Sequence, residues 1–339
     1  MREMLEQLCG AAGAGGLTAA AERAAEFLRQ YTDDVSLDAM GNVVGIRRCG
    51  AAGAPLLLLE AHQDEIGFLV TQVDDGGFVH VGACGGVDAR ALAAAEVVIW
   101  AEKPILGVFC STPPHLSGGQ EDKLPEIPDM GIDTGLDAKK AKKRIRPGMR
   151  VTFRPNFRVL EGGRVTSKAL DDRAGVAAVL HCLELLKEDK LQWDIAAVFA
   201  VQEELGCRGS AVAAFNAEPD RAIAVDVSFA RTPDANPAKC GILGKGPMIG
   251  YAPGLDIVMT QVLAETAAEE KIPFQREVMG GDTGTDADSI AGAGAGVPTA
   301  LLSIPLRYMH TPAEMVDLAD VEAVGRLMAA YIRKEGAAQ

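Results

Sequence analysis

Short apolar runs recur along the chain, and a polar or charged residue follows most of them. Residues 55–61 (PLLLLEA), 195–201 (IAAVFAV), 222–225 (AIAV) and 298–304 (PTALLSI) are the clearest examples. Continuous apolar runs of this length, bounded by Gly, Pro and charge, are typical of strands that are buried on both faces of an α/β sheet. The pattern therefore predicts a sheet whose central strands are covered on both sides.

Segments with helical periodicity lie between these strands. Residues 18–30 form an amphipathic pattern with Thr18 as a plausible N-cap, and residues 173–188 repeat Val and Leu at helical spacing. The remaining predicted elements are helices at 208–216, 255–270 and 320–334 and strands at 42–47 and 273–278. This alternation predicts an α/β sandwich with a mixed central sheet.

The pattern changes between residues 66 and 160. Short alternating segments rich in glycine, such as IGFLVTQV and MRVTFRP, are typical of the strands of a small β domain. The loop at 111–132 is rich in Pro and Gly, and loops of that length are usually functional or mobile. We therefore predict a discontinuous catalytic domain, 1–67 and 164–339, interrupted by a β-barrel-like domain at 68–163.

Composition excludes several classes of partner. The 339 residues carry a net charge of -14, and aromatic residues make up 5%. Nucleic acids and anionic membranes are polyanions, which a chain of this negative charge would repel. Single-stranded nucleic acids also need aromatic side chains on which their bases stack, and few are present. Neither nucleic acids nor membranes are therefore expected partners. The one basic run, KKAKKRIR at 139–146, is interpreted as a solvated helix face. No apolar stretch reaches membrane-spanning length, and the N-terminus has no signal-peptide pattern.

The seven cysteines are scattered singly, without a Cys-x-x-Cys pair. An odd count at irregular spacing is typical of reduced, buried cysteines rather than of a disulfide framework. We therefore expect a cytoplasmic protein.

A set of polar residues with metal-binding chemistry follows the predicted strands. The carboxyl ends of such strands meet at one edge of the sheet, where α/β proteins place their sites. Histidines and carboxylates that converge there predict a metal site, and the number of carboxylates favours two ions. The residues are His62, Asp64, Asp171, Glu203, Glu204, Asp226 and His310.

Each element of this set has a simpler interpretation when taken alone. Asp64 could hold the imidazole of His62 or orient a base, although a surface turn also explains His-x-Asp. Glu203 and Glu204 are adjacent, which suggests that one binds metal while the other takes a proton; an acidic helix start explains the pair equally. Asp171 could bridge two cations or begin a helix.

Three other histidines are not expected to bind metal. Their places are a strand, a loop and a helix: His80, His115 and His181. His115 could approach the site only if its loop closes over it.

Six ordered motifs resemble those of a known family. They are AHQDEIG at 61–67, SKALDDRAG at 167–175, VQEELGCRG at 201–209, VD at 225–226, GTDA at 284–287 and RYMHTPAEMVD at 307–317. The set is similar to that of the glutamyl/deblocking aminopeptidases, tetrahedral dinuclear metallopeptidases of which some relatives carry an endoglucanase label. The resemblance extends over nearly the whole chain.

The resemblance implies a role for each residue of the set. It implies one metal on His62, Asp171 and Asp226, and a second on Asp171, Glu204 and His310. It further implies that Glu203 is the general base, that Asp64 supports His62, and that the Asp171–Asp172 peptide is cis. Family members form dodecamers from dimers that are built through the β insert, so we expect a homo-oligomer.

The function expected from the residues and the resemblance is release of N-terminal residues from small peptides. Two divalent ions would activate water. Zinc or cobalt is expected, and this ligand set also accepts manganese. Two alternatives remain: a glycosidase that uses the paired carboxylates, and a non-catalytic assembly protein on the same scaffold. A chelator or peptide turnover would separate them.

Substrate preference is left open by the sequence. Arg208 or Arg307 could pair with an acidic side chain, whereas the acidic stretch at 280–288 could favour basic or neutral residues. The same stretch departs from the family's usual glycine-rich run, and the N-terminal AAGAGGLTAAAE lacks the usual Pro-Ser-Gly-x-Glu. Every proposed ligand position is nevertheless filled.

Overall fold

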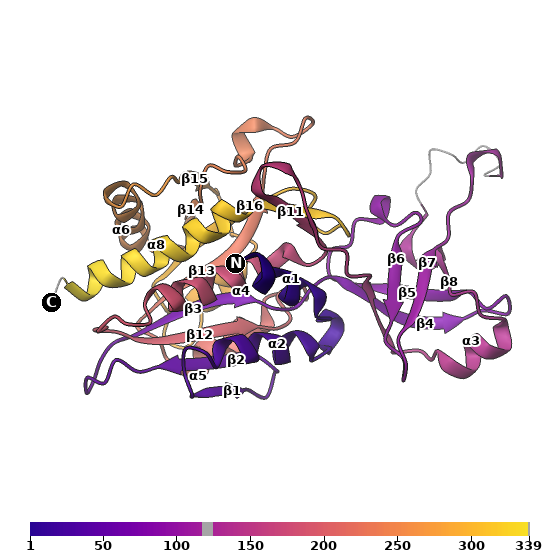
Figure 1. The fold of residues 1–339 in the computed structure, drawn as a ribbon, viewed down its shortest axis with the longest axis horizontal. Helices are drawn as coiled ribbons and strands as arrows, with labels where there is room; N and C mark the ends of the chain where they lie inside the picture. The colour runs from indigo at the N-terminus through magenta and orange to yellow at the C-terminus, as the bar shows by residue number, and fades with distance from the viewer. Residues whose placement is uncertain (117–124, 338–339) are drawn as a thin grey trace.

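An eight-stranded mixed sheet forms the centre of the larger part of the molecule, and a closed barrel stands beside it (Figure 1). The structure is a computed structural model that describes residues 1–116 and 125–337. The sheet order is β1 (Val35–Leu37), β2 (Val43–Arg47), β12 (Asp194–Ala200), β3 (Leu56–His62), β13 (Arg221–Phe229), β16 (Thr299–Leu306), β14 (Met248–Tyr251) and β15 (Gln275–Val278). The predicted fold class is confirmed.

The central strands are buried on both faces because alternate residues enter different cores. Leu57 and Leu59 of β3 pack into one core, whereas Leu58 between them packs into the other. The first core contains residues of α1 (Arg2–Gly10), α2 (Ala19–Leu28), α4 (Leu170–Leu185), α6 (Ile257–Glu269) and α8 (Leu318–Ala337), and the second those of α5 (Arg208–Ala217) and α7 (Asp286–Ala291).

The barrel has its own hydrophobic core, which includes a cluster of three phenylalanines. The ring centroids of Phe68 and Phe109 are 5.0 Å apart, and Phe153 meets Phe68 edge-on. The barrel closes because its last strand pairs with its first. The strand order is β4 (Gly67–Val73), β5 (Val79–Cys84), β8 (Gly131–Asp133), β7 (Ile105–Phe109), β6 (Glu96–Ile99) and β9 (Arg150–Phe153). Closure leaves this β segment without free edges.

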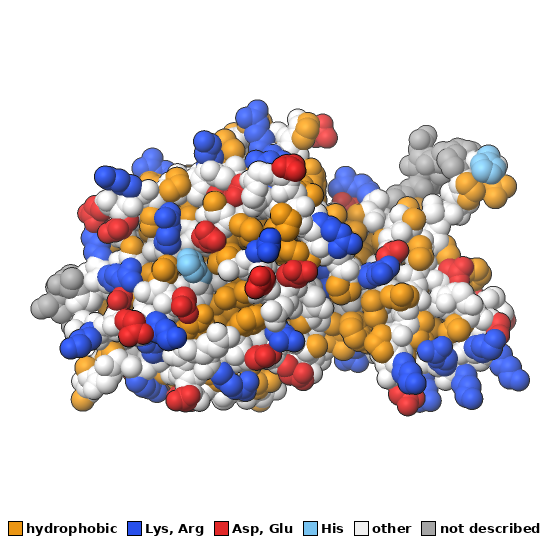
Figure 2. All heavy atoms as spheres, in the orientation of Figure 1, with side chains coloured by type: hydrophobic (Ala, Val, Ile, Leu, Met, Phe, Trp, Pro, Cys, Tyr) orange, Lys and Arg blue, Asp and Glu red, His pale blue; other side chains and the backbone are white. Residues whose placement is uncertain are grey.

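The basic run forms a surface helix, α3 (Ala138–Arg144), at the end of the barrel. Lys and Arg side chains gather over this end in Figure 2. Ala141 is the buried residue of the helix. This agrees with the interpretation of a solvated helix face. The seven cysteines carry free thiols. Within the described ranges, no helix combines the length and apolar character that crossing a membrane requires.

Several element boundaries differ from those predicted. Helix α4 begins at Leu170 and ends at Leu185 rather than covering 173–188. Thr18 occupies the N-cap of α2, but its hydroxyl donates to Glu22 instead of capping the backbone. The middle of the 111–132 loop, residues 117–124, lies outside the described residues.

A three-stranded sheet and a buried ion pair lie beside the joint between the barrel and the larger part. The sheet consists of β10 (Arg158–Val159), β11 (Arg164–Ser167) and β17 (Glu314–Asp317). Just after β11, Nζ of Lys168 lies 2.7 Å from Oε2 of Glu65, and both side chains are almost fully buried. The other oxygen of Glu65 accepts the backbone N–H of Gly13. The pair therefore ties three distant segments together.

Removal of the Lys168 charge should destabilise the fold strongly. Lys168→Met leaves the Glu65 carboxylate buried without its cation, and breaking such a pair costs about 3–5 kcal/mol. The free energy of unfolding, measured by chemical denaturation, should fall by this amount. Lys140→Met removes an exposed partner of Asp137 and should change the same quantity by less than about 0.5 kcal/mol. Equal stability of the two variants would show that the buried pair has no stabilising role.

Candidate metal centre

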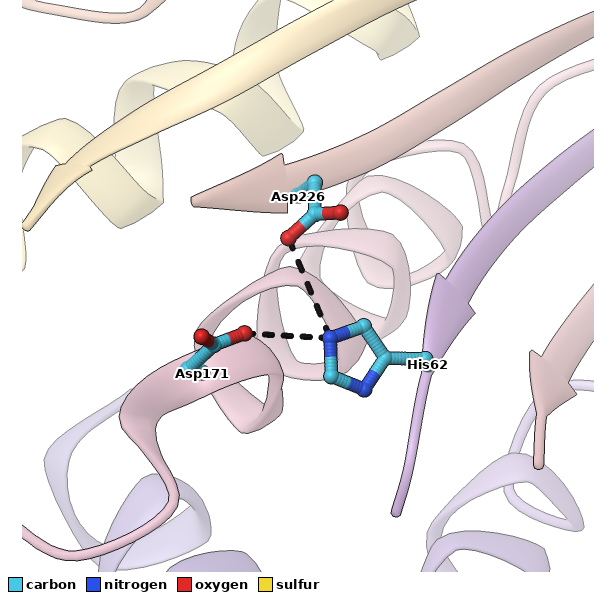
Figure 3. Close-up of side chains that lie close together, drawn as sticks. All are labelled: His62, Asp171 and Asp226. Carbon is cyan, nitrogen blue, oxygen red and sulfur yellow. Dashed lines mark hydrogen bonds and ion pairs between the residues drawn. The ribbon is translucent and has the colours of Figure 1, made fainter. Parts of the chain in front are cut away.

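His62 lies at the end of strand β3 and points over the sheet face that carries Asp226. Its position follows from alternation, because residues 58, 60 and 62 of one strand share a face. Nε2 of His62 lies 3.0 Å from Oδ1 of Asp171 and 3.8 Å from Oδ1 of Asp226, as Figure 3 shows. The three residues are 2–6% exposed. These residues form one group that could hold a metal ion.

The sequence analysis placed Asp226 at the end of its strand, but Asp226 lies inside the strand. Strand β13 continues to Phe229 because its pairing with β16 extends to Leu306. The apolar run in the sequence stops earlier than the hydrogen-bonded ladder, which also includes Ser228. The last four residues of β13, in which Asp226 and Ser228 alternate with two apolar residues, therefore lie along the candidate site.

Asp171 presents its two carboxylate oxygens to different histidines. Oδ1 faces His62, and Oδ2 lies 3.4 Å from Nε2 of His310. The local backbone makes this possible, since Ala169 has a φ of 57° and the first residues of α4 depart from helical geometry. The Asp171–Asp172 peptide is cis, as the resemblance implied. Asp171 therefore has the arrangement that a carboxylate shared by two cations requires.

His310 and Glu204 complete a second group around Asp171. Nε2 of His310 lies 3.5 Å from Oε2 of Glu204, and the three ligand atoms fall within 4.8 Å of one another. Nδ1 of His310 lies 2.8 Å from the carbonyl oxygen of Gly86, to which its N–H donates. A histidine that donates through one ring nitrogen keeps the lone pair of the other for a metal. Gly86 follows β5, so the barrel segment helps to orient this side chain.

The electrostatics of the two groups are those of carboxylates crowded in a buried space. Burial raises the pKa of Glu204 to about 8, and the negative charge of Asp171 adds to this effect. Burial also raises the pKa of Asp226. The hydrogen bond with Asp171 raises the pKa of His310 to about 9. Although burial opposes it, hydrogen bonding with both histidines lowers the pKa of Asp171. Burying so many carboxylates is energetically unfavourable unless their charge is balanced. Divalent cations would balance it and displace the protons that the cluster would otherwise hold.

Glu203 lies beside these groups in the turn between β12 and α5. Its Oε2 is 4.0 Å from Nε2 of His62, and its backbone N–H donates to Oδ1 of Asp64 over 3.2 Å. Asp64 also lies 3.5 Å from Nδ1 of His62, so it contacts both residues that it was expected to support. Burial raises the pKa of Glu203, and the charges of Asp286 and Asp171 raise it further against the effect of His62.

Glu314 is a supporting residue to which the sequence analysis gave no role. It lies on β17 and is buried; Oε2 accepts the backbone N–H of Asp171, while Oε1 accepts that of His310. One carboxylate therefore fixes the backbone of two candidate ligands. Glu314 falls inside the quoted RYMHTPAEMVD motif, but its spacing alone gives no indication of this contact.

The seven predicted side chains are brought together, whereas the other histidines are not. His80 lies in the barrel and contacts Asp74, His181 lies within α4, and His115 is exposed in the 114–116 turn. None of the three belongs to a candidate metal group among the described residues. Arg208 and Arg307, considered for substrate binding, are also absent from the described lining of the cleft.

A cleft of about 400 Å³ opens over the two groups. One end is lined by Asp171, Glu203, Glu204, Asp226 and His310. The cleft continues along β13, β16 and β15, and its lining there includes Ser228, Glu277, Met279, Leu301 and Ser303. A small organic molecule could therefore reach the carboxylates and extend along the sheet.

Known proteins match this chain over almost its whole length. It is 35% identical to a lysyl aminopeptidase of Pyrococcus furiosus, over 91% of this chain and 89% of that protein. An aminopeptidase structure from Desulfurococcus kamchatkensis superposes with a TM-score of 0.91 at 34% identity, covering 98% of this chain and 94% of the other. The TET1 peptidase of Pyrococcus horikoshii, described as assembling into a tetrahedron or an octahedral shell, gives 0.85 at 29% identity, with coverage of 97% and 98%.

The family comparison agrees with these relatives. The family model of the M42 glutamyl aminopeptidases matches residues 41–327, which include all seven predicted site residues. The resemblance inferred from the six motifs is confirmed. This protein belongs to the M42 glutamyl aminopeptidase family and is by that membership a hydrolase of the aminopeptidase class.

Proposed function

We propose that this chain releases N-terminal residues from small peptides with two divalent cations and a glutamate base. The observation that carries the proposal is the carboxylate of Asp171, whose two oxygens face the two histidines of separate ligand groups. A carboxylate is the side chain that offers one oxygen to each of two cations. M42 peptidases are metal-dependent, and the candidate groups supply nitrogen and oxygen ligands.

The two groups divide the proposed ligands. His62, Asp171 and Asp226 would hold one cation, and Asp171, Glu204 and His310 the other. Imidazole and carboxylate ligands suit zinc, cobalt or manganese. When bound, such a pair supplies Lewis acidity, which makes water nucleophilic near neutral pH and polarises a carbonyl group.

Glu203 is the proposed general base. It is held through its backbone by Asp64, next to His62 but outside both candidate metal groups. Its raised pKa moves it toward the range in which a carboxylate can accept a proton and release it again. In the proposed reaction, Glu203 takes a proton from the attacking water and delivers it to the amine that leaves. The free α-amine of the substrate would bind at the same carboxylate cluster, which would restrict the reaction to peptide ends.

We further propose that residues 68–163 form a dimerisation domain in a dodecamer built from dimers. Leu106 and Val108 of β7 are 58% and 41% exposed, beside a depression lined by Glu96 and Arg154. Exposed apolar residues grouped in this way are typical of interfaces. The assembly described for TET1 supports the proposal. Light scattering after size exclusion should give the mass of twelve chains; the 35.5 kDa mass of a single chain would contradict it.

The function is tested by hydrolysis of a panel of aminoacyl-p-nitroanilides. Metal-free protein should be inactive, and zinc, cobalt or manganese should restore release of nitroaniline. N-acetylated substrates are the matched control, because they lack the free amine and should not be cleaved. Folded protein that releases no nitroaniline with any metal would contradict the proposal. Hydrolysis of a β-glucan that persists with chelator would favour the glycosidase.

A further inference from the structure

The cleft contains a carboxylate that neither candidate metal group uses. Glu277 lies on β15 and lines the end of the cleft away from Glu203 and Glu204. Both of its oxygens accept hydroxyl donors: the hydroxyl of Ser303 donates to Oε2 over 2.6 Å, and that of Ser228 donates to Oε1. Ser303 is fully buried and Ser228 nearly so. Glu277 is therefore held in a fixed position rather than projecting freely into solvent.

The sheet register allows this contact. Glu277 pairs with Gly250 on β14, and Gly250 has no side chain to fill the space between β15 and β16. Ser303 of β16 pairs with Met248, two residues before Gly250. The register also pairs Ser303 with Asp226, and Ser228 lies two residues after Asp226 on the same face. One strand repeat of two residues spans about 7 Å. Ser303 lies directly across from Asp226, and Ser228 lies one such repeat along β13, so the Glu277 carboxylate that both serines contact lies within about one repeat of the candidate metal ligand Asp226.

This separation matches the length of a basic side chain. The four-carbon stem of lysine carries its ammonium about 6 Å from the α-carbon. If the α-amine binds at the metal cluster, a lysine side chain directed along β13 ends near Glu277. Met279 and Leu301 line the same part of the cleft and offer apolar contact for the methylene groups.

The charges of the cleft favour a cation at this end. The described lining contains neither lysine nor arginine, and Glu277 forms no ion pair with any other residue of the described ranges. The other carboxylates of the lining are the proposed ligands and base, so bound cations would balance them. A carboxylate has about four lone-pair positions, and the two serine hydroxyls use two, which leaves acceptor capacity for an ammonium or guanidinium group.

We propose that Glu277 is a specificity-determining residue that makes the enzyme prefer peptides with N-terminal lysine or arginine. The inference rests on the proposed aminopeptidase function and adds its substrate class. The proposed preference is the opposite of the glutamyl preference in the family's name. An acidic substrate side chain at this end of the cleft would be repelled by the like charge of Glu277.

The test compares lysyl- and norleucyl-p-nitroanilide on the metal-loaded enzyme. Norleucine has the same stem length without the ammonium, so the ratio of the two kcat/KM values isolates the charge contact. The wild type should favour lysine by about 10–100-fold, the range expected for a hydrogen bond to a charged group. Glu277→Gln keeps the shape and should bring the ratio close to one. Arginyl-p-nitroanilide should follow lysine.

Asp282→Asn is the matched control, since Asp282 is exposed in the acidic 280–288 stretch beside the cleft. It removes the same charge and should leave the ratio unchanged. A ratio near one in the wild type, or an equal ratio in Glu277→Gln and the wild type, would overturn the inference while leaving the aminopeptidase function intact. The inhibition constants of free L-lysine and free L-norleucine give a second readout. In Glu277→Gln, inhibition by lysine should weaken while inhibition by norleucine should stay unchanged. If no substrate is cleaved by the wild type, the proposed function itself fails.

Discussion

Glu203→Gln is expected to keep both metal ions and to lose about 10²–10⁴-fold in kcat, because general-base catalysis contributes that factor. Glutamine has nearly the shape of glutamate but cannot accept the proton. The backbone bond from residue 203 to Asp64 does not involve the changed group, so the side chain should stay in place. Steady-state hydrolysis of an aminoacyl-p-nitroanilide and elemental analysis of the same sample measure both quantities.

Glu218→Gln is the control for this change. Glu218 is exposed at the end of α5, outside the cleft lining, and undergoes the same chemical replacement. Its kcat should equal that of the wild type. If Glu203→Gln retains full activity, Glu203 is not the base. If it loses metal as well as rate, Glu203 acts as a ligand instead.

The second large effect is expected from the candidate ligands. Asp171 belongs to both groups, so Asp171→Asn should reduce the occupancy of both ions and abolish activity. His62→Ala and His310→Ala each alter one group and should reduce the bound metal toward one ion per chain. Loss of a ligand removes the Lewis acid that activates water, which is why the rate should fall together with the metal.

His80→Ala separates ligand loss from general effects of removing an imidazole. His80 contacts Asp74 in the barrel and belongs to neither candidate group. Metal content after dialysis, measured by elemental mass spectrometry, should match the wild type in this variant. Unchanged metal in Asp171→Asn would remove the bridging role from the account.

The sequence predicted the central sheet well because buried strands need long apolar runs. Those runs locate β3, β12 and β16 to within about two residues, and His62 and the Glu203–Glu204 pair follow directly from where they stop. Asp226 was misplaced at a strand end because β13 continues through Val227, Ser228 and Phe229, where polar and apolar residues alternate along the cleft. In this strand, the hydrophobic pattern and the hydrogen-bonded ladder end at different residues.

Other features depend on contacts between distant segments and leave little trace in the local pattern. Strand β14 (Met248–Tyr251) is short and contains Gly250, so its sequence resembles a loop. Glu314 and Glu277 look like ordinary polar positions of short strands, yet one fixes two candidate ligands and the other meets two serines across the sheet. The 208–216 helix prediction succeeded because α5 buries small residues at helical spacing.

The central claim is that two divalent cations act together in one subunit. Metal-free protein should be titrated with zinc or cobalt while hydrolysis and bound metal are followed in the same samples. The account predicts that activity appears with metal and reaches its plateau at two equivalents per chain. Full activity at one equivalent, or hydrolysis by protein that contains no metal, would contradict it.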